Sequence, residues 1–199
     1  MNKICLSLIG ILMITHVTIA QHQEERYLMK VDSLWMKEVF PLPTGFAQEM
    51  TLEGFEEAIF PPGWSKKESP QFWSYIFAWS VANEKPSTLK TLENNLEIYF
   101  DGLMGVPKDT LRDPKLPTTA LLVETSNSDG QTQYSGKVRT YDNFRSKKMM
   151  TLHVKATQYA CSKEEKAVIV FRFSPREFDD AVWDYLGAIP IRDDYCTHQ

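Results

Sequence analysis

Several common signatures of enzymes and cofactor proteins are missing from this sequence of 199 residues. It contains no CxxC pair, no HExxH motif, no GxSxG nucleophile elbow and no glycine-rich phosphate loop. The four histidines and three cysteines are scattered along the chain, and they form no cluster at metal-ligand spacing. The sequence therefore predicts neither a metal site nor a bound cofactor, and no motif identifies a reaction.

An excess of positive charge is also missing. Lysine and arginine total 22 against 26 aspartate and glutamate, a net charge of −4. This balance argues against nucleic-acid binding through overall charge. Nine glycines and eleven prolines exclude a collagen-like or low-complexity chain, and the 43% hydrophobic content is typical of a folded domain.

A long apolar run occurs only at the N-terminus. Residues 1–20 combine an early lysine with a short apolar stretch, and Thr18 and Ala20 are small residues at the spacing of a signal-peptide cleavage site. The apolar stretch is shorter than the ~20 residues that a membrane-spanning helix needs. We expect a signal peptide cleaved after Ala20, a secreted or periplasmic protein, no transmembrane segment thereafter, and a single domain over 21–199.

Export changes the interpretation of the remaining cysteines. Cys161 and Cys196 would lie in an oxidising compartment, where two cysteines usually pair. The sequence therefore predicts a Cys161–Cys196 disulfide, and chain entropy sets an upper value of about 3.8 kcal/mol on its contribution to stability.

Hydropathy patterning of the mature chain predicts an α+β fold with an antiparallel sheet of about six strands, packed by helices. Short connections between the last four strands predict an antiparallel meander, with a hairpin turn at Asp129–Gly130. In chain order, the predicted elements are a helix over 24–39, strands over 54–60 and 71–82, a helix from Ser87 to Gly102 or Gly105, strands over 120–125, 131–141, 149–161 and 166–174, and a C-terminal helix.

The C-terminal helix has a clear local start signal. Ser174 is suited to the N-cap, Pro175 to the first helical position, and Glu177 completes a capping box. Gly187 is suited to end the helix.

The overall order of elements is similar to that of PsbP-type domains, which occur in photosystem accessory proteins and their bacterial relatives. The similarity is one of element order alone, so it implies a fold and no function.

One predicted strand carries a stripe of large aromatic rings. Alternation places Trp73, Tyr75, Phe77 and Trp79 on the same face of the strand over 72–82. We interpret these rings as the main core, because they hold much of the largest apolar surface. The alternative is that they line a cavity that carries a small apolar ligand.

The alternation of side chains between the two faces of each strand also predicts a cationic face of the sheet. If the strands pair in order, one face of the sheet gathers the following side chains: Lys137, Arg139, Tyr141, His153, Lys155 and Arg172. Val168 and Val170 fall on the same face of the strand as Arg172, which implies that a helix or the loop over 106–117 covers part of this face. We interpret the face as solvated, with docking of an anionic ligand or protein partner as the sharper hypothesis.

Acid–base catalysis has one weak candidate, His153, which we expect to be a half-exposed strand residue. The adjacent acidic pairs are interpreted as solvated or as helix first-turn charges, because neighbouring side chains diverge; they are Glu56–Glu57, Glu164–Glu165 and Asp179–Asp180. The sequence therefore favours an exported, non-catalytic binding or accessory protein. A small hydrolase using His153 with an acidic partner, and a carrier of an apolar ligand, remain as alternatives.

Overall fold

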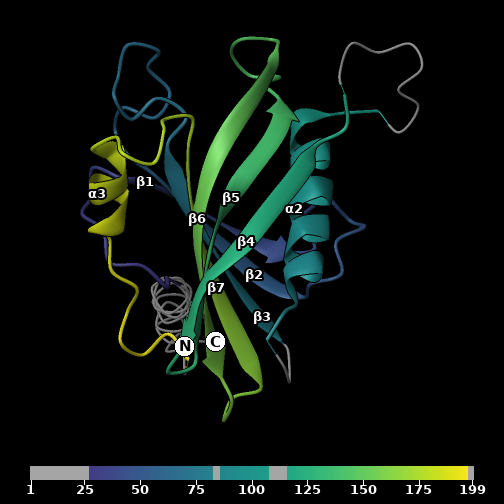
Figure 1. Ribbon diagram of the computed structural model, residues 1–199, viewed down its shortest axis with the longest axis vertical. Coiled ribbons are helices and arrows are strands. Elements are labelled where there is room, and N and C mark those ends of the chain that lie inside the picture. Colours follow the sequence, from purple (N-terminus) through teal and green to yellow (C-terminus); the bar gives the residue numbers. More distant parts are fainter. Residues whose placement is uncertain (1–26, 83–85, 108–115, 197–199) are drawn as a thin grey trace, which may run out of the picture.

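The computed structural model describes residues 27–82, 86–107 and 116–196, and its strands form a single antiparallel sheet (Figure 1). The predicted signal peptide lies outside the described residues. The elements are β1 (Met36–Leu42), β2 (Gly54–Phe60), β3 (Tyr75–Ala82), α2 (Leu89–Met104), β4 (Thr119–Ser128), β5 (Gln131–Tyr141), β6 (Met149–Cys161), β7 (Lys166–Ser174) and α3 (Val182–Gly187). The predicted antiparallel sheet with a few helices is confirmed, with seven strands in the order β1-β2-β3-β7-β6-β5-β4.

Two antiparallel units make up the sheet. Strands β4 to β7 form the predicted meander, and the β4–β5 turn has Asp129 and Gly130 at positive φ, as a two-residue hairpin requires. Strands β1, β2 and β3 form the second unit. The two units join where β3 pairs with β7, opposing Tyr75 to Phe173.

The predicted helix over 24–39 is wrong for residues 27–39, and residues 24–26 lie outside the described residues. Leu34 and Trp35 belong to a turn, in which the Leu34 amide donates to the Asp32 carboxylate, and β1 then pairs with β2 over its whole length. Pairing with β2 satisfies the backbone better than a short isolated helix would. A proline at position 41 is tolerated because β1 is an edge strand.

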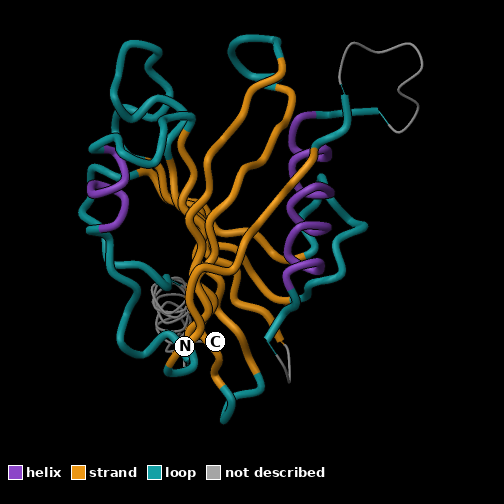
Figure 2. Tube along the Cα trace, in the orientation of Figure 1, coloured by secondary structure: helices purple, strands orange, loops and turns teal. Residues whose placement is uncertain are grey.

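Helices lie on opposite sides of the sheet, α2 on one and α3 on the other (Figure 2). We call the side that faces α2 the inner face. It carries the larger buried cluster, whose largest fully buried side chains are Phe77, Trp79, Phe100, Phe171 and Phe173. The rings that the sequence placed in the core thus pack between the sheet and α2.

The side that faces α3 is the outer face. Its smaller cluster joins β2, β3 and β7 to α3 and to the segment before β1. Leu28 and Trp35 from that segment pack here with Trp183 and Leu186 of α3. The predicted covering of Val168 and Val170 is therefore real: both are buried in this cluster.

Helix α2 begins and ends close to the predicted positions. Thr88, one residue after the predicted cap, accepts a hydrogen bond from the Thr91 amide at 3.1 Å, and Gly105 ends the helix in the left-handed conformation. Glycine suits that position because it has no Cβ to clash.

The start of the C-terminal helix was predicted wrongly. Ser174 is still part of β7, where its hydroxyl lies 2.8 Å from the Ser74 hydroxyl, and α3 begins only at Val182. The Asp180 carboxylate accepts a hydrogen bond from the Val182 amide at 2.8 Å. The capping-box residues do not start a helix, because Ser174 is paired within the sheet as the last residue of β7.

The predicted disulfide between Cys161 and Cys196 is present. It ties the end of β6 to the C-terminal segment. None of the helices in the described part of the chain is both long enough and apolar enough to cross a bilayer.

Candidate functional site

A small cavity with mostly aromatic walls lies on the inner face, between strands β1 to β3 and the C-terminal half of α2. We call it the aromatic pocket. Its volume is about 150 Å³, and eight of its eleven lining residues are aromatic. The lining residues are Glu38, Phe40, Phe46, Ala58, Phe60, Trp64, Trp73, Tyr75, Tyr99, Leu103 and Phe144.

The loop between β2 and β3 builds one wall of the aromatic pocket. The Trp73 amide donates to the Trp64 carbonyl at 2.8 Å, which brings the two indoles together with their centroids 6.3 Å apart. Trp73 has a φ of 54°, an uncommon conformation for a bulky residue. Tyr75 then begins β3 and stacks on Phe60 of β2.

A buried carboxylate lies behind this wall. Glu56 accepts hydrogen bonds from Tyr99 Oη and Trp79 Nε1, each at 2.8 Å, and is fully buried. Burial raises the pKa of Glu56 to about 7, although the two hydrogen bonds lower it. Burial and the neighbouring Glu56 also raise the pKa of Tyr75 well above its usual value.

Two polar atoms in the pocket walls are buried without a hydrogen-bond partner among the described residues. They are Nε1 of Trp73 and the hydroxyl of Tyr75. Both side chains are only 4% exposed. Such groups are rare in folded proteins, because each loses its bonds to water on burial.

The loop between β5 and β6 forms the rim of the aromatic pocket. Phe144 stacks on Trp73, and the Arg145 guanidinium lies 5.9 Å from the ring centroid of Trp64. Asp142 fixes this loop by accepting from the backbone amides of Phe144, Arg145 and Ser146. Burial raises the pKa of Asp142, but these hydrogen bonds outweigh it and leave the pKa below its usual value.

The four rings of the predicted aromatic stripe divide between the pocket and the core. Trp73 and Tyr75 line the aromatic pocket. Phe77 and Trp79 are fully buried deeper on the inner face, where their rings stack on each other.

The residues of the predicted cationic face lie in register on the outer face, but most are engaged by neighbouring segments. Lys137 opposes His153 and Lys155 opposes Arg172. Arg172 donates to the carbonyls of Leu186 and Ile189, so the end of α3 covers it.

Three further members differ in their exposure. Lys155 lies over the ring of Trp183, with Nζ 5.0 Å from its centroid. Tyr141 is buried at the end of β5, whereas Arg139 is exposed, as is Lys137 beside it.

His153 is buried rather than half-exposed. Its Nε2 lies 3.1 Å from a carboxylate oxygen of Glu177, and its ring packs edge-on against Phe178. The side chain of His153 is 4% exposed and that of Glu177 is 75% exposed. The segment before α3 thus covers the histidine and leaves its carboxylate partner in solvent.

The interpretation of Glu56 and Glu57 as solvated side chains is wrong. Both are fully buried, on opposite faces of β2. Glu57 accepts hydrogen bonds from the amides of Leu28 and Met29, so it anchors the segment before β1. Burial raises its pKa to about 7. The alternation of side chains along β2 could have revealed that Glu56 is buried, because it lies on the same face as Ala58 and Phe60.

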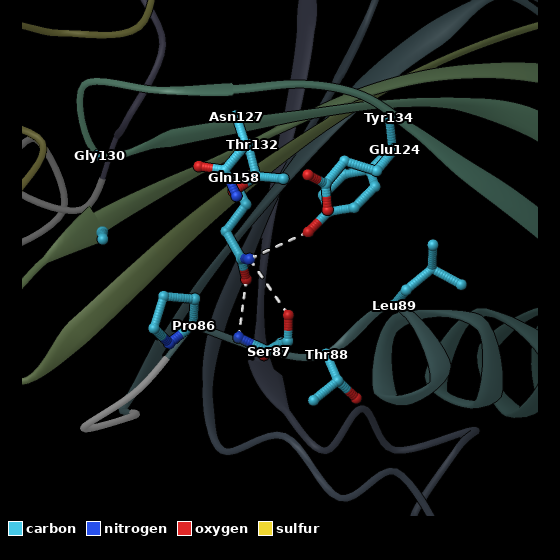
Figure 3. A pocket seen from close by; sticks show the side chains of 11 residues that line it. Pro86, Ser87, Thr88, Leu89, Glu124, Asn127, Gly130, Thr132, Tyr134 and Gln158 are labelled. Carbon is cyan, nitrogen blue, oxygen red and sulfur yellow. Dashed lines mark hydrogen bonds between the residues drawn. The ribbon is translucent and has the colours of Figure 1, made fainter.

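A second, polar cavity of about 300 Å³ lies at the start of α2 (Figure 3). The amide of Gln158 crosses its floor, accepting from the Ser87 backbone at 2.9 Å and donating to the Ser87 carbonyl and to Tyr134 Oη. The two bonds to Ser87 tie the residue before the α2 N-cap to β6, and the bond to Tyr134 joins β6 to β5, so Gln158 serves as a structural clip.

Within the described ranges, no group of three or more His, Cys, Asp or Glu side chains is arranged to hold a metal ion. No protein-family model matches the chain, and neither a curated protein nor a solved structure matches it.

Proposed function

We propose that this chain is an exported binding protein whose aromatic pocket holds a compact, largely apolar group of a small molecule. The observation that carries the proposal is the pocket itself. Protein interiors contain few voids larger than a water molecule, and apolar cavities of roughly 150 Å³ are known to take a benzene-sized guest. The aromatic pocket has that volume and a predominantly aromatic wall.

Hydrogen bonds hold the walls of the aromatic pocket in place, which favours binding. Successive turn hydrogen bonds fix the β2–β3 loop, and Asp142 fixes the β5–β6 loop. Preformed walls reduce the entropy lost on binding. At the rim, Phe144 is 53% exposed and Phe46 is 36% exposed, so apolar surface continues from the pocket to solvent.

Export is supported by two independent features. Residues 1–20 have the pattern of a signal peptide, and the Cys161–Cys196 disulfide fits an oxidising compartment. We also propose that the order of elements in this fold is similar to that of PsbP-type domains, a similarity that implies no function.

The test is calorimetric titration of the purified protein with 3,3-dimethyl-1-butanol, a compact neutral probe. We expect saturable binding with a Kd on the order of 0.1–1 mM, as suits a ligand this small. Ala58→Leu, which fills the pocket from β2, should abolish binding, and Leu103→Phe fills it independently from α2. A Lys137→Glu variant on the outer face should bind normally. Absence of binding, or normal binding by both filled variants, would contradict the proposal.

A second candidate function is docking of an anionic partner on the outer face. It is favoured by Lys137 and Arg139, which stay exposed beside the exposed apolar residues Leu121 and Val123 of β4. An oligoglutamate peptide should then bind in low salt, and the double variant Lys137→Glu/Arg139→Glu should remove that binding. Equal binding by the variant would exclude this surface.

A further inference from the structure

Beyond its rings, the aromatic pocket has a distinct electrostatic character. Glu38 lines it and is the only charged residue among the eleven lining residues. Glu56 lies directly behind Tyr99, which is itself part of the wall. Aromatic faces are the negative side of the ring quadrupole, so the rings and the Glu38 carboxylate favour a cationic ligand, and Glu56 adds to this above about pH 7, where its carboxyl group is ionised.

We infer that the aromatic pocket selects a small methylated ammonium group, held against its ring faces with Glu38 as counter-ion. This inference rests on the proposed function, because it names the class of ligand that the same pocket takes.

Methylation matters because of the composition of the wall. A primary ammonium carries three N–H donors, and besides Glu38 the lining side chains offer only two tyrosine hydroxyls as acceptors, those of Tyr75 and Tyr99. Burying such a group beside apolar rings would leave donors without partners, which is costly. A trimethylammonium group presents only C–H surface, so its charge can interact with ring faces without hydrogen bonds.

One ring in the pocket wall, that of Tyr99, makes a hydrogen bond that strengthens its attraction to a cation. Tyr99 Oη donates to Glu56 Oε1 at 2.8 Å. A phenol that donates to a carboxyl group gains electron density in its ring, most strongly when that group is ionised, and this strengthens attraction to a cation. Through this hydrogen bond, Glu56 increases the attraction of the Tyr99 ring for a cation.

Arg145 and Glu38 have opposite expected effects on the affinity of the pocket for a cation. Arg145 lies over Trp64 and would repel a bound cation, while the Asp142 carboxylate is already bonded to three backbone amides. Removing the Arg145 charge should therefore increase affinity for a cation, and removing the Glu38 charge should decrease it.

The test compares choline with 3,3-dimethyl-1-butanol, its uncharged isostere, by calorimetry at constant ionic strength. We expect choline to bind at least about tenfold more tightly. Glu38→Gln should remove most of this preference while leaving affinity for the alcohol unchanged, and Arg145→Gln should increase the preference. Glu53→Gln, an exposed glutamate outside the pocket, makes the same change in net charge and should alter neither affinity.

The outcomes separate the two proposals. If the alcohol binds in the aromatic pocket and choline binds no more tightly, the methylated-ammonium inference is overturned and the proposed function stands. The inference is also overturned if Glu53→Gln reduces choline affinity as much as Glu38→Gln does. If neither compound binds, both proposals fail.

Discussion

The carboxylate of Glu93 on α2 accepts a hydrogen bond from the backbone amide of Leu122 on β4, with 2.9 Å between Oε1 and N. It is the first of a row: Glu97 accepts from Ala120 at 3.0 Å, and Asp101 from Thr118 at 2.7 Å. Four helical residues advance about 6 Å and two strand residues about 6.8 Å, so the two series match. Carboxylates of α2 therefore occupy the outward amides of this edge of the sheet.

Removing this row should destabilise the protein and expose the edge strand. We expect Glu93→Ala/Glu97→Ala to lower the free energy of unfolding by about 3–6 kcal/mol, since two hydrogen bonds are lost and each hydrogen bond to a charged group contributes about 1.5–3 kcal/mol. The freed β4 edge should also promote self-association. Urea unfolding and light scattering measure the two effects. Lys90→Ala on the same helix is the control, and an equally small effect for both variants would contradict this role.

Removing the hydroxyl groups of two tyrosines in the aromatic pocket should change the free energy of unfolding in opposite directions. The Tyr75 hydroxyl has no partner among the described residues, so Tyr75→Phe should raise the free energy of unfolding by up to about 1 kcal/mol. Tyr99 Oη donates to Glu56, so Tyr99→Phe should lower it by about 1.5–3 kcal/mol. Chemical denaturation of the unliganded protein compares them, and a similar loss in both variants would argue against the assigned contacts.

Stability should fall as pH rises from about 5 to about 7. Glu56 and Glu57 have a pKa of about 7 in the folded protein, against 4.5 when unperturbed. Between these values the folded state retains protons that the unfolded state has lost, so raising the pH favours unfolding. Each group contributes a slope of up to about 1.4 kcal/mol per pH unit. Urea unfolding across this window measures the slope.

A substitution isolates the contribution of the buried carboxylate behind the pocket. Glu56→Gln should reduce the slope by about half, because only Glu57 then titrates in the window. The exposed control Glu53→Gln should leave the slope unchanged. A stability that is flat or rising over this range would show that these carboxyls are not protonated in the folded state.

The disulfide should contribute substantially to stability. Cys161→Ser/Cys196→Ser should lower the free energy of unfolding by up to about 3.8 kcal/mol, the chain-entropy value for a loop of this length. Thermal unfolding compares the variant with the parent protein. Little change would mean that the C-terminal segment is held by its other contacts, such as the hydrogen bond from the Arg192 amide to the Leu28 carbonyl.

Local patterns predicted the elements whose structure depends on local sequence. Helix α2 has its own cap at Thr88 and its own stop at Gly105, and the β4–β7 meander follows from alternation and short turns. Strand β1 and the start of α3 were predicted wrongly because partners distant in sequence decide them. Pairing with β2 extends β1, and pairing within β7 keeps Ser174 out of a helix.

The candidate site was less predictable for the same reason. Trp73 and Tyr75 were recognisable from the aromatic stripe, but Trp64 and Phe144 reach the aromatic pocket from loops far apart in the chain. Glu38 lies on the strand predicted as helix, so its position could not be derived. Only the paired sheet brings these side chains together.

The most direct test of a ligand-binding aromatic pocket is to follow the tryptophan indole N–H signals by NMR during titration with 3,3-dimethyl-1-butanol. Trp64 and Trp73 line the pocket, whereas Trp35 and Trp183 pack in the outer-face cluster and serve as internal controls. We expect saturable shifts of the Trp64 and Trp73 signals, with the signals of the two controls unmoved. No shift at saturating probe, or shifts confined to the controls, would contradict it.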